Sequence, residues 1–154
     1  MRISTKGHYA VQALVDMASL HRTSPVTLGM IAERQGLSQN YLEQLFVKLR
    51  KAELVKSVRG PGGGYLLARP AGKISIGDVF SAVDESLIFI ECADEENQLK
   101  KPCAKSKDCV TQAFWAKLCQ HFNSLVFSVS IEDVVEGNVD LARGFATQKA
   151  KASA

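Results

Sequence analysis

The sequence predicts a mainly α-helical protein that carries one small β-hairpin. Apolar residues recur at three- and four-residue steps along several stretches, which is the period of a helix buried on one face. In the middle of the chain, "GPGGG" separates two short runs of β-prone residues, which is typical of a hairpin turn. At 154 residues the chain suits one ordinary domain or two small ones.

The first two helices follow from apolar spacing and capping residues. One helix is expected from Thr5 to about His21, and the loop "RTSPV" ends it. Its inward positions are Tyr9, Ala10, Ala13, Leu14, Met17, Ala18 and Leu20. Thr27 is a suitable N-cap for a short helix, "LGMIAERQ", and Gly36 is expected to close that helix in a left-handed conformation.

A third helix is expected over residues 38–52, with Ser38 as its N-cap. Its buried stripe is predicted to be Tyr41, Leu42, Leu45, Phe46 and Leu49. Its outward side chains are predicted to be Gln39, Asn40, Glu43, Gln44 and Lys48. The runs "LVKSVR" and "YLLA" flank the glycine-rich turn as two strands. Residues 27–52 followed by this hairpin predict a winged helix-turn-helix.

The C-terminal half is predicted to contain a long helix that needs a covering surface. Before it, "ISIGDVFSAVDES" predicts a helix with one apolar face, made of Ile76, Val79, Phe80 and Val83. From Asp108 to about Val129 another apolar stripe follows, made of Val110, Phe114, Leu118, Phe122 and Val126, with Ala113 and Leu125 beside it. About 20 residues make roughly 30 Å of helix. A second copy of the chain is the expected cover, and the first helix of the same chain is the alternative.

These elements predict four parts. A winged helix-turn-helix domain is expected over residues 1–86, and a cysteine-bearing loop over 87–107. Residues 108–144 are expected to hold the dimerisation helix and a short C-terminal helix, "IEDVVEGNVDLA". Residues 145–154 are expected to be a flexible tail.

The charge of the chain is unevenly distributed. Residues 1–73 hold 11 basic and 4 acidic side chains, a net charge of +7, whereas residues 74–154 hold 8 and 12, a net charge of −4. A basic half favours a polyanionic partner, because neutralised phosphates release counterions. A basic surface that is merely solvated is the alternative on charge alone.

Together with the winged helix-turn-helix pattern, this charge indicates binding to double-stranded DNA. The second helix of such a motif enters the major groove, where its exposed N-terminal turn contacts base edges and phosphates. The candidate contacts are Ser38, Gln39, Asn40, Glu43, Gln44 and Lys48 on the helix and Arg59, Gly60, Pro61 and Gly62 at the wing. Arg59 would suit a minor groove. DNA phosphates repel the carboxylate of Glu43. It would be tolerated if it accepts a hydrogen bond from cytosine N4, or if it lowers the affinity for some DNA sites and so sharpens discrimination.

The sequence favours a DNA-binding protein over an enzyme or a membrane protein. The "GPGGG" segment lacks the Lys and Ser or Thr of a phosphate loop and the third glycine of a dinucleotide fingerprint. His8, His21 and His121 are scattered, with no paired nucleophile, so neither catalysis nor a small-molecule substrate is expected. No apolar run reaches 18 residues, and a cytoplasmic location is expected.

Three of the four cysteines, Cys92, Cys103 and Cys109, fall in the hydrophilic stretch "CADEENQLKKPCAKSKDC". In a reducing compartment such clustered cysteines more often bind metal or act as redox switches than form disulfides. Cys119, ten residues further on, is expected to be a buried apolar side chain.

Three stretches then closely resemble IscR-type transcription regulators, the winged-helix proteins that sense iron–sulfur clusters. They are "MRISTKGHYAVQAL", "YLEQLFVKLRKAELVKSVRGPGGGYLLARP" and "ISIGDVFSAVDES". The resemblance, which covers roughly residues 1–126, implies a homodimer built on the long helix, a palindromic operator, and DNA contacts from residues 38–52 and the wing. It also implies a [2Fe-2S] cluster in the 92–112 region, with Cys92, Cys103 and Cys109 as ligands.

The chain departs from that family at two places. The gap between Cys92 and Cys103 is several residues longer than usual, which a loop can absorb because closure entropy grows slowly with length. Gln112 stands where the family has its cluster histidine, and an amide is a poorer iron ligand than imidazole. His8 of the partner subunit is the preferred fourth ligand, because in a sister branch that includes the nitric-oxide sensor NsrR an acidic residue at the matching position has that role. The alternative for His8 is a side chain that faces DNA or solvent.

The predicted function is a homodimeric DNA-binding regulator that senses iron–sulfur status, redox state or nitric oxide. Three cysteines with an uncertain fourth ligand also fit tetrahedral zinc. A metal-free thiol switch is a third possibility for the loop. The rival from another class is a metal-stabilised interaction module whose basic face binds an acidic partner.

Overall fold

The computed structural model describes residues 3–20, 23–90 and 109–140. Most of the predicted cysteine loop, including Cys92 and Cys103, lies outside these residues. The predicted C-terminal tail lies wholly outside them. The elements, in chain order, are α1 (Thr5–Leu20), α2 (Leu28–Gln35), α3 (Gln39–Lys51), β1 (Val55–Val58), β2 (Gly64–Leu67), the short 3-10 helix η1 (Ala71–Lys73), α4 (Ile76–Ala82), α6 (Gln112–Ser128) and α7 (Ile131–Glu136). The predicted mainly helical fold with one hairpin is confirmed. None of the helices within the described ranges has the length and apolar character that crossing a bilayer requires.

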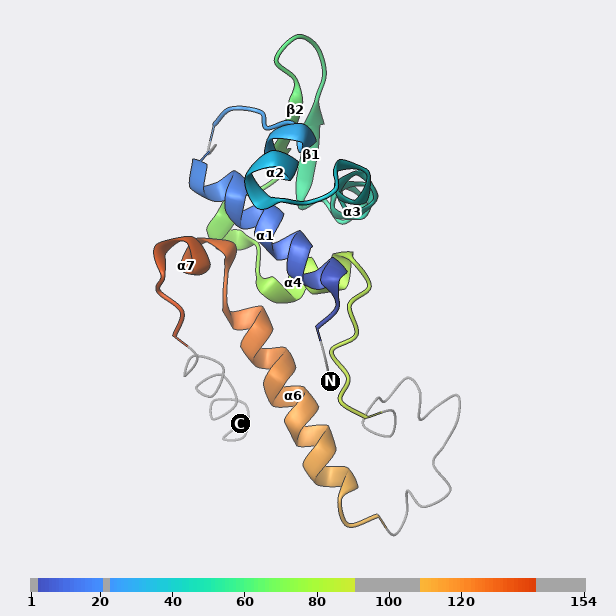
Figure 1. Cartoon of the computed structure of the whole chain (residues 1–154). Coiled ribbons are helices and arrows are strands. Elements are labelled where there is room, and N and C mark those ends of the chain that lie inside the picture. The colour runs from blue at the N-terminus through green and yellow to red at the C-terminus, as the bar shows by residue number, and fades with distance from the viewer. Residues whose placement is uncertain (1–2, 21–22, 91–108, 141–154) are drawn as a thin grey trace.

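The elements form one compact body and one projecting helix (Figure 1). Helix α1 crosses the middle of the body, with α2, α3 and the β1–β2 hairpin on one side of it and α4 and α7 on the other. Helix α6 packs against α4 at its C-terminal end and extends away from the body toward its N-terminal end. The helix-turn-helix and the wing therefore occupy the end of the molecule opposite to the start of α6.

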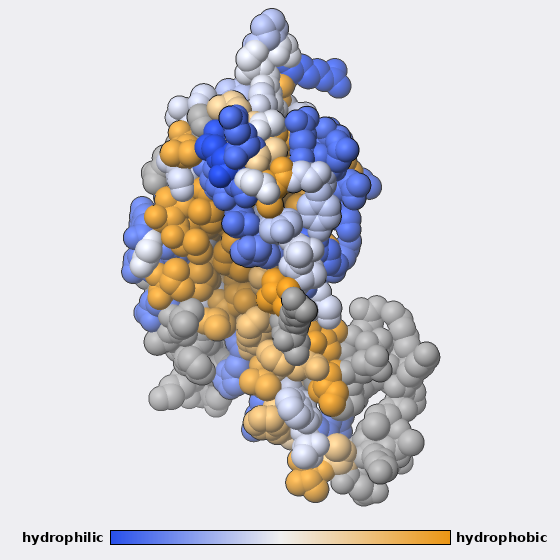
Figure 2. Space-filling view, viewed as in Figure 1, coloured by the Kyte–Doolittle hydropathy of each residue, from blue (hydrophilic) through white to orange (hydrophobic). Residues whose placement is uncertain are grey.

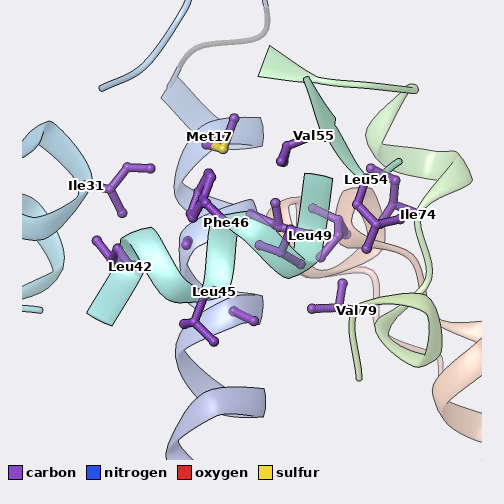
Figure 3. Packing of buried hydrophobic residues seen from close by; sticks show 14 of the residues in the cluster. Met17, Ile31, Leu42, Leu45, Phe46, Leu49, Leu54, Val55, Ile74 and Val79 are labelled. Carbon is purple, nitrogen blue, oxygen red and sulfur yellow. The ribbon is translucent and has the colours of Figure 1, made fainter. Parts of the chain in front are cut away.

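The core lies where α1, α2, α3, β1, α4 and α7 meet. Figure 3 shows Phe46 and Leu49 of α3 pointing toward Met17 of α1 and toward Leu54 and Val55. The stripe predicted for α3 is confirmed, since Leu42, Leu45, Phe46 and Leu49 are buried and Tyr41 is half-buried. Each such side chain contributes about 1.5–3 kcal/mol on burial. Burial of one face leaves the opposite face of α3 for solvent or a partner.

Helix ends agree with the predictions where local capping decides them. Thr27 accepts a hydrogen bond from the Met30 amide, and Gly36 closes α2 at φ 64, as expected. Ser38 is the N-cap residue of α3, as predicted, although its side chain makes no capping hydrogen bond. Leu20, predicted to face inward, is 60% exposed, because it ends α1 and no described element covers it.

The two C-terminal helices differ from the prediction in their limits. Helix α6 begins at Gln112 and not at Asp108, so Val110 precedes the helix and is 94% exposed instead of belonging to its stripe. Helix α7 ends at Glu136, because Gly137 adopts a left-handed φ of 68 and terminates the helix. The predicted helix over "IEDVVEGNVDLA" is therefore real but about half as long as expected.

The wing is fastened to the loop before α2. Strands β1 and β2 pair antiparallel, from Val55 opposite Leu67 to Val58 opposite Gly64. Val26 donates to the Tyr65 carbonyl at 2.9 Å, and Tyr65 donates back at 2.8 Å, so Val26 acts as a one-residue third strand. A Cβ atom on Gly64 would lie 2.5 Å from the Val26 carbonyl oxygen, so this close approach requires glycine. No sequence pattern predicted this contact.

Helices α4 and α7 begin side by side with the same capping arrangement. Ser75 caps α4 and pairs with Asp78, and Ser130 caps α7 and pairs with Asp133, each in a reciprocal capping box. The Ile76 amide donates to the Val129 carbonyl at 2.9 Å, and the Ile131 amide donates to the Ile74 carbonyl at 2.8 Å. These two bonds connect the end of α6 to the main body.

Candidate nucleic-acid interface and metal-ligand residues

Helix α3 presents a polar surface from its first turn onward. Gln39, Asn40, Glu43 and Gln44 are exposed, as predicted, and Ser38 before them is exposed as well. The Gln39 amide donates to the Glu43 carboxylate at 3.3 Å, which orients both side chains along the helix. These amide and carboxylate groups can donate to and accept from base edges in a major groove.

The wing places a second set of exposed groups beside α3. Arg59, Gly60, Pro61 and Gly62 form the exposed tip of the hairpin, where Gly60 and Gly62 adopt φ values of 105 and 73. Figure 1 shows the wing and α3 next to each other at the upper end of the body, and Figure 2 shows hydrophilic residues gathered over this region. A helix and a neighbouring wing in this arrangement can contact a groove and the adjacent backbone of one duplex.

Most of the basic charge on this half is available to a partner. Within residues 3–20, 23–90 and 109–140, the ion pairs are Arg34–Asp16 and Lys48–Asp84. A hollow of about 600 Å³ at the base of the wing is lined in part by Arg50, Lys56 and Arg69. These three cations lack an ion pair in the described part of the chain. The surface near α3 and the wing is therefore cationic, as the charge count predicted.

A buried carboxylate that no motif in the sequence indicates fixes α2 against α1. Asp16 is only 5% exposed and lies on the inward face of α1. Arg34 Nε donates to Asp16 Oδ1 at 3.0 Å, and Gln35 Nε2 donates to the same oxygen at 2.9 Å. The hydrogen bond to Asp16 raises the pKa of Arg34. The only signal in the sequence was an acidic residue between the inward positions Ala13 and Met17.

A second acidic cluster follows α4 and joins three parts of the domain. Glu85 accepts from the Ser4 amide at 3.0 Å and from the Ser4 hydroxyl. Burial raises the pKa of Glu85, but the Ser4 hydrogen bonds and nearby Lys6 outweigh this, so its pKa lies below the usual value. Asp84 accepts from Lys48 of α3 at 2.8 Å, and this bond lowers the pKa of Asp84. The turn at residues 84–85 therefore links the start of α1 to α3.

Of the predicted metal ligands, Cys109 and Gln112 lie together at the start of α6. The Gln112 amide donates to the Cys109 carbonyl at 3.2 Å. The Cys109 side chain is half-buried, and its sulfur lies 3.4 Å from the Thr111 hydroxyl. Cys109 and Cys119 are the two cysteines within the described ranges. A cysteine at the Cys109 position offers a sulfur that can ligate a metal as a thiolate.

The described residues do not complete a metal site by themselves. They contain no group of three or more His, Cys, Asp or Glu side chains placed to hold an ion. His8 is exposed on α1, with its ring 5.5 Å from that of Tyr9. Cys119 is buried on α6, as expected of a cysteine that is not a ligand. Some of the further ligands of a metal at Cys109 would therefore have to come from outside the described ranges or from another chain, and thiolates from Cys92 and Cys103 would give a donor set suited to iron–sulfur chemistry.

Comparison with known proteins gives one consistent result. The model of the Rrf2 family, described as iron-dependent transcriptional regulators, matches residues 3–137. A protein of Xenorhabdus nematophila named HTH-type transcriptional regulator IscR is 48% identical over 136 residues, covering 88% of this chain and 80% of that protein. A Klebsiella pneumoniae protein of the same name is 47% identical over 135 residues, covering 88% and 80%.

Solved structures agree with the sequence matches. The structure of T. potens IscR has a TM-score of 0.70 and 40% identity, covering 90% of this chain and 88% of that one. CymR, the global cysteine regulator of B. subtilis, has a TM-score of 0.70 and 31% identity, covering 88% and 97%. The winged-helix prediction is confirmed, and so is the prediction that the chain is a regulator and not an enzyme. The chain belongs to the Rrf2 family of iron-dependent transcriptional regulators.

Proposed function

We propose that the chain acts as a homodimer on a palindromic operator and senses iron–sulfur status through a [2Fe-2S] cluster. The observation that carries the proposal is the exposed polar surface of α3 beside a cationic wing, on a chain of an iron-dependent regulator family. The relatives named IscR, at 47–48% identity, support the iron–sulfur part. Such a regulator works in the cytoplasm, where bacterial DNA lies.

The DNA contacts are assigned by position. Asn40 and Gln44, exposed on the first two turns of α3, would contact base edges, and Ser38 and Gln39 would contact the backbone or bases beside them. Glu43 would accept from cytosine or reject other bases. At the wing, Arg59 would enter the minor groove, while Gly60, Pro61 and Gly62 let the turn approach the backbone. Lys48 lies on the same helix, one turn beyond Gln44.

Cys92, Cys103 and Cys109 would hold the cluster. Thiolates are the usual ligands of such clusters, and the group, when bound, supplies a centre that changes with oxidants and iron supply. Cys109 would anchor one end, because its carbonyl is held at the start of α6 by the Gln112 amide. The fourth ligand would be His8 of a partner subunit or, less suitably for iron, Gln112.

The DNA-binding part is tested with two duplexes. A palindromic and a scrambled site are titrated with wild-type protein and with Gln44→Ala, Arg59→Ala and Lys117→Ala variants. Gln44→Ala is expected to weaken the free energy of binding to the palindromic duplex by about 1–3 kcal/mol, and that of binding to the scrambled duplex by less. Lys117 is exposed on α6, far from the wing, so its variant is the charge-matched control for Arg59. Equal affinity of the wild type for both duplexes would contradict operator recognition and favour a general basic interaction module.

The cofactor part is tested by anaerobic purification with visible spectroscopy and analysis of iron, sulfide and zinc. Coloured protein that contains iron and sulfide is expected. Cys109→Ala should abolish the absorption, whereas Cys119→Ala, which removes the buried cysteine of α6, should keep it. Loss of the absorption in only one of His8→Ala and Gln112→Ala would name the fourth ligand. Colourless protein with bound zinc would overturn the iron–sulfur assignment in favour of a structural zinc site.

A further inference from the structure

One ion pair connects α3 to the turn after α4. Lys48 Nζ lies 2.8 Å from Asp84 Oδ2. The Asp84 carbonyl also accepts from Lys6 Nζ of α1 at 2.5 Å. Asp84 adopts a left-handed φ of 55, one of the two such values outside glycine in the described chain. This turn thus brings one carboxylate to the lysine of the helix that faces DNA.

The pair contributes little to the stability of the fold. The side chains of Lys48 and Asp84 are 44% and 76% exposed. Exposed ion pairs add little to folding, because solvent screens the charges and both side chains lose rotational freedom. The same exposure means that a competing anion can reach Lys48 without unfolding anything.

The position of Lys48 on α3 makes DNA phosphate the relevant competitor. Residues four apart lie on the same line of a helix surface, so Lys48 is one turn beyond Gln44. When base-contacting residues of a helix occupy a groove, a lysine further along that line comes close to the backbone at the groove edge. In this structure the ammonium group binds the Asp84 carboxylate instead.

We propose that Asp84 withholds Lys48 from the DNA backbone and thereby limits the sequence-independent part of DNA affinity. The inference rests on the proposed function, since it requires that α3 faces DNA. A freed Lys48 would neutralise one more phosphate, and the slope of log affinity against log salt would steepen by about 0.9. Because a phosphate contact carries no sequence information, affinity for every duplex would rise by the same factor.

The experiment compares wild type, Asp84→Asn, Asp84→Gly, Lys48→Met and the double variant Lys48→Met/Asp84→Asn in the full chain. Asparagine and glycine both tolerate the left-handed backbone of residue 84. Affinity for the palindromic and scrambled duplexes is measured at four salt concentrations. Both Asp84 variants are expected to bind each duplex about two- to fivefold more tightly, the range that corresponds to an exposed ion pair. When Lys48 is already replaced by methionine, adding Asp84→Asn should change neither the affinity for DNA nor the slope of log affinity against log salt.

Glu136→Gln is the matched control, because it removes one exposed carboxylate at the end of α7, away from α3. The gain in affinity must exceed that of this control, and thermal unfolding must show that each variant is folded. Unchanged or weaker binding by the folded Asp84 variants overturns the inference alone, as does a gain that persists without Lys48. Wild-type protein that binds neither duplex overturns the proposed function and this inference with it.

Discussion

Asp16 shows how one residue can set the relation between two helices. Its carboxylate is buried in α1 and accepts from both Arg34 and Gln35 at the end of α2. A buried carboxylate is stable only when its hydrogen bonds are satisfied. The bonds to two consecutive residues of α2 therefore specify the angle at which the helix-turn-helix meets α1.

Replacing Asp16 by alanine should lower the free energy of unfolding by about 2–4 kcal/mol, because Arg34 loses its partner while part of its side chain stays buried. Urea unfolding followed by circular dichroism measures the change. The neighbouring exposed acid provides the control, since Glu33→Ala should change stability by no more than about 0.5 kcal/mol. A loss as small as that of the control would show that the ion pair is not structural.

The acidic turn after α4 predicts how stability depends on pH. The folded pKa of Glu85 is lowered, so its contribution is present above the pKa of an unfolded glutamate, about 4.3, and is lost as pH falls through the lower folded value. Glu85→Gln should therefore be less stable than wild type at pH 7, and the difference should shrink below about pH 4. Melting temperatures between pH 3 and 7 measure this difference. A difference in melting temperature between the two proteins that is the same at every pH would contradict a lowered folded pKa of Glu85.

The sequence predicted single residues well where a local rule applied. Thr27 and Gly36 cap α2 as expected, because capping depends on neighbours in the chain. Asp16 and Asp84 escaped prediction, because their partners lie 18 and 36 residues away in the sequence. Ser38 illustrates the limit of a local rule, since it has the right position and backbone but no capping bond.

Among the elements, α6 depends on a glycine in α4 for its attachment. A Cβ atom on Gly77 would lie 2.5 Å from the ring of Phe127, so the phenyl ring packs directly on the α4 backbone. The ring lies near the end of α6, next to the hydrogen bonds that join residues 129–131 to 74–76. This junction fixes the direction in which α6 leaves the body.

Gly77→Ala should destabilise the protein by about 1–3 kcal/mol through overpacking against Phe127. The sign of this stability change is informative, because replacing glycine by alanine inside a helix otherwise stabilises a protein by about 0.5–1 kcal/mol. Gly29→Ala is the matched control, since its Cβ atom would meet nothing closer than 3.5 Å and should be neutral or stabilising. Thermal unfolding of the two variants distinguishes the effects. A stabilised Gly77→Ala protein would show that Phe127 moves away at little cost.

The elements were predictable where periodicity and turns were strong, and less so at the C-terminal end. The β-hairpin and the first three helices follow the predicted order, because each is specified by its own apolar pattern and its own turn residues. The start of α6 was misplaced, because Val110 continues the apolar spacing without being helical. The contact of Val26 with the wing has no local signal at all.

For the whole molecule, the described residues leave part of the projecting α6 uncovered. Phe114 and Phe127 are 59% and 48% exposed, and Figure 2 shows apolar residues along this helix. Helix α6 packs on α4 only near its C-terminal end, so the alternative cover by the first helix of the same chain is not what the structure favours. An apolar helix of 17 residues supports the proposed dimer.

Phe114→Ser should weaken dimerisation by about 2 kcal/mol or more, as truncation of a central aromatic residue at an interface does. Light scattering coupled to size-exclusion chromatography, over a range of protein concentrations, measures the monomer fraction. Lys117→Ser, an exposed polar position on the same helix, should leave the dimer unchanged. Wild-type protein that is monomeric at every concentration would contradict the proposed dimer.

The candidate site could be predicted only in part. The polar residues of α3 and the wing tip are exposed together, as the motif implied, because a winged helix fixes both. The ligand set of the cysteine loop stays a prediction, since it depends on long-range placement that no residue pattern specifies and on residues outside the described ranges. Lys48, expected from the sequence as a simple DNA contact, is paired with Asp84 in this structure, and no residue pattern indicated that pairing.

The backbone pairing of Val26 with Tyr65 has a consequence for how the protein meets a duplex. Because the hairpin is held at its base by the segment that starts α2, it cannot swing independently of the paired helices. The spacing between α3 and the wing is thereby set before any encounter, so little ordering entropy would be lost if both contact DNA as proposed. On the proposed mode of binding, a duplex whose groove spacing differs would have to bend to fit, and DNA stiffness would then influence the choice of operator.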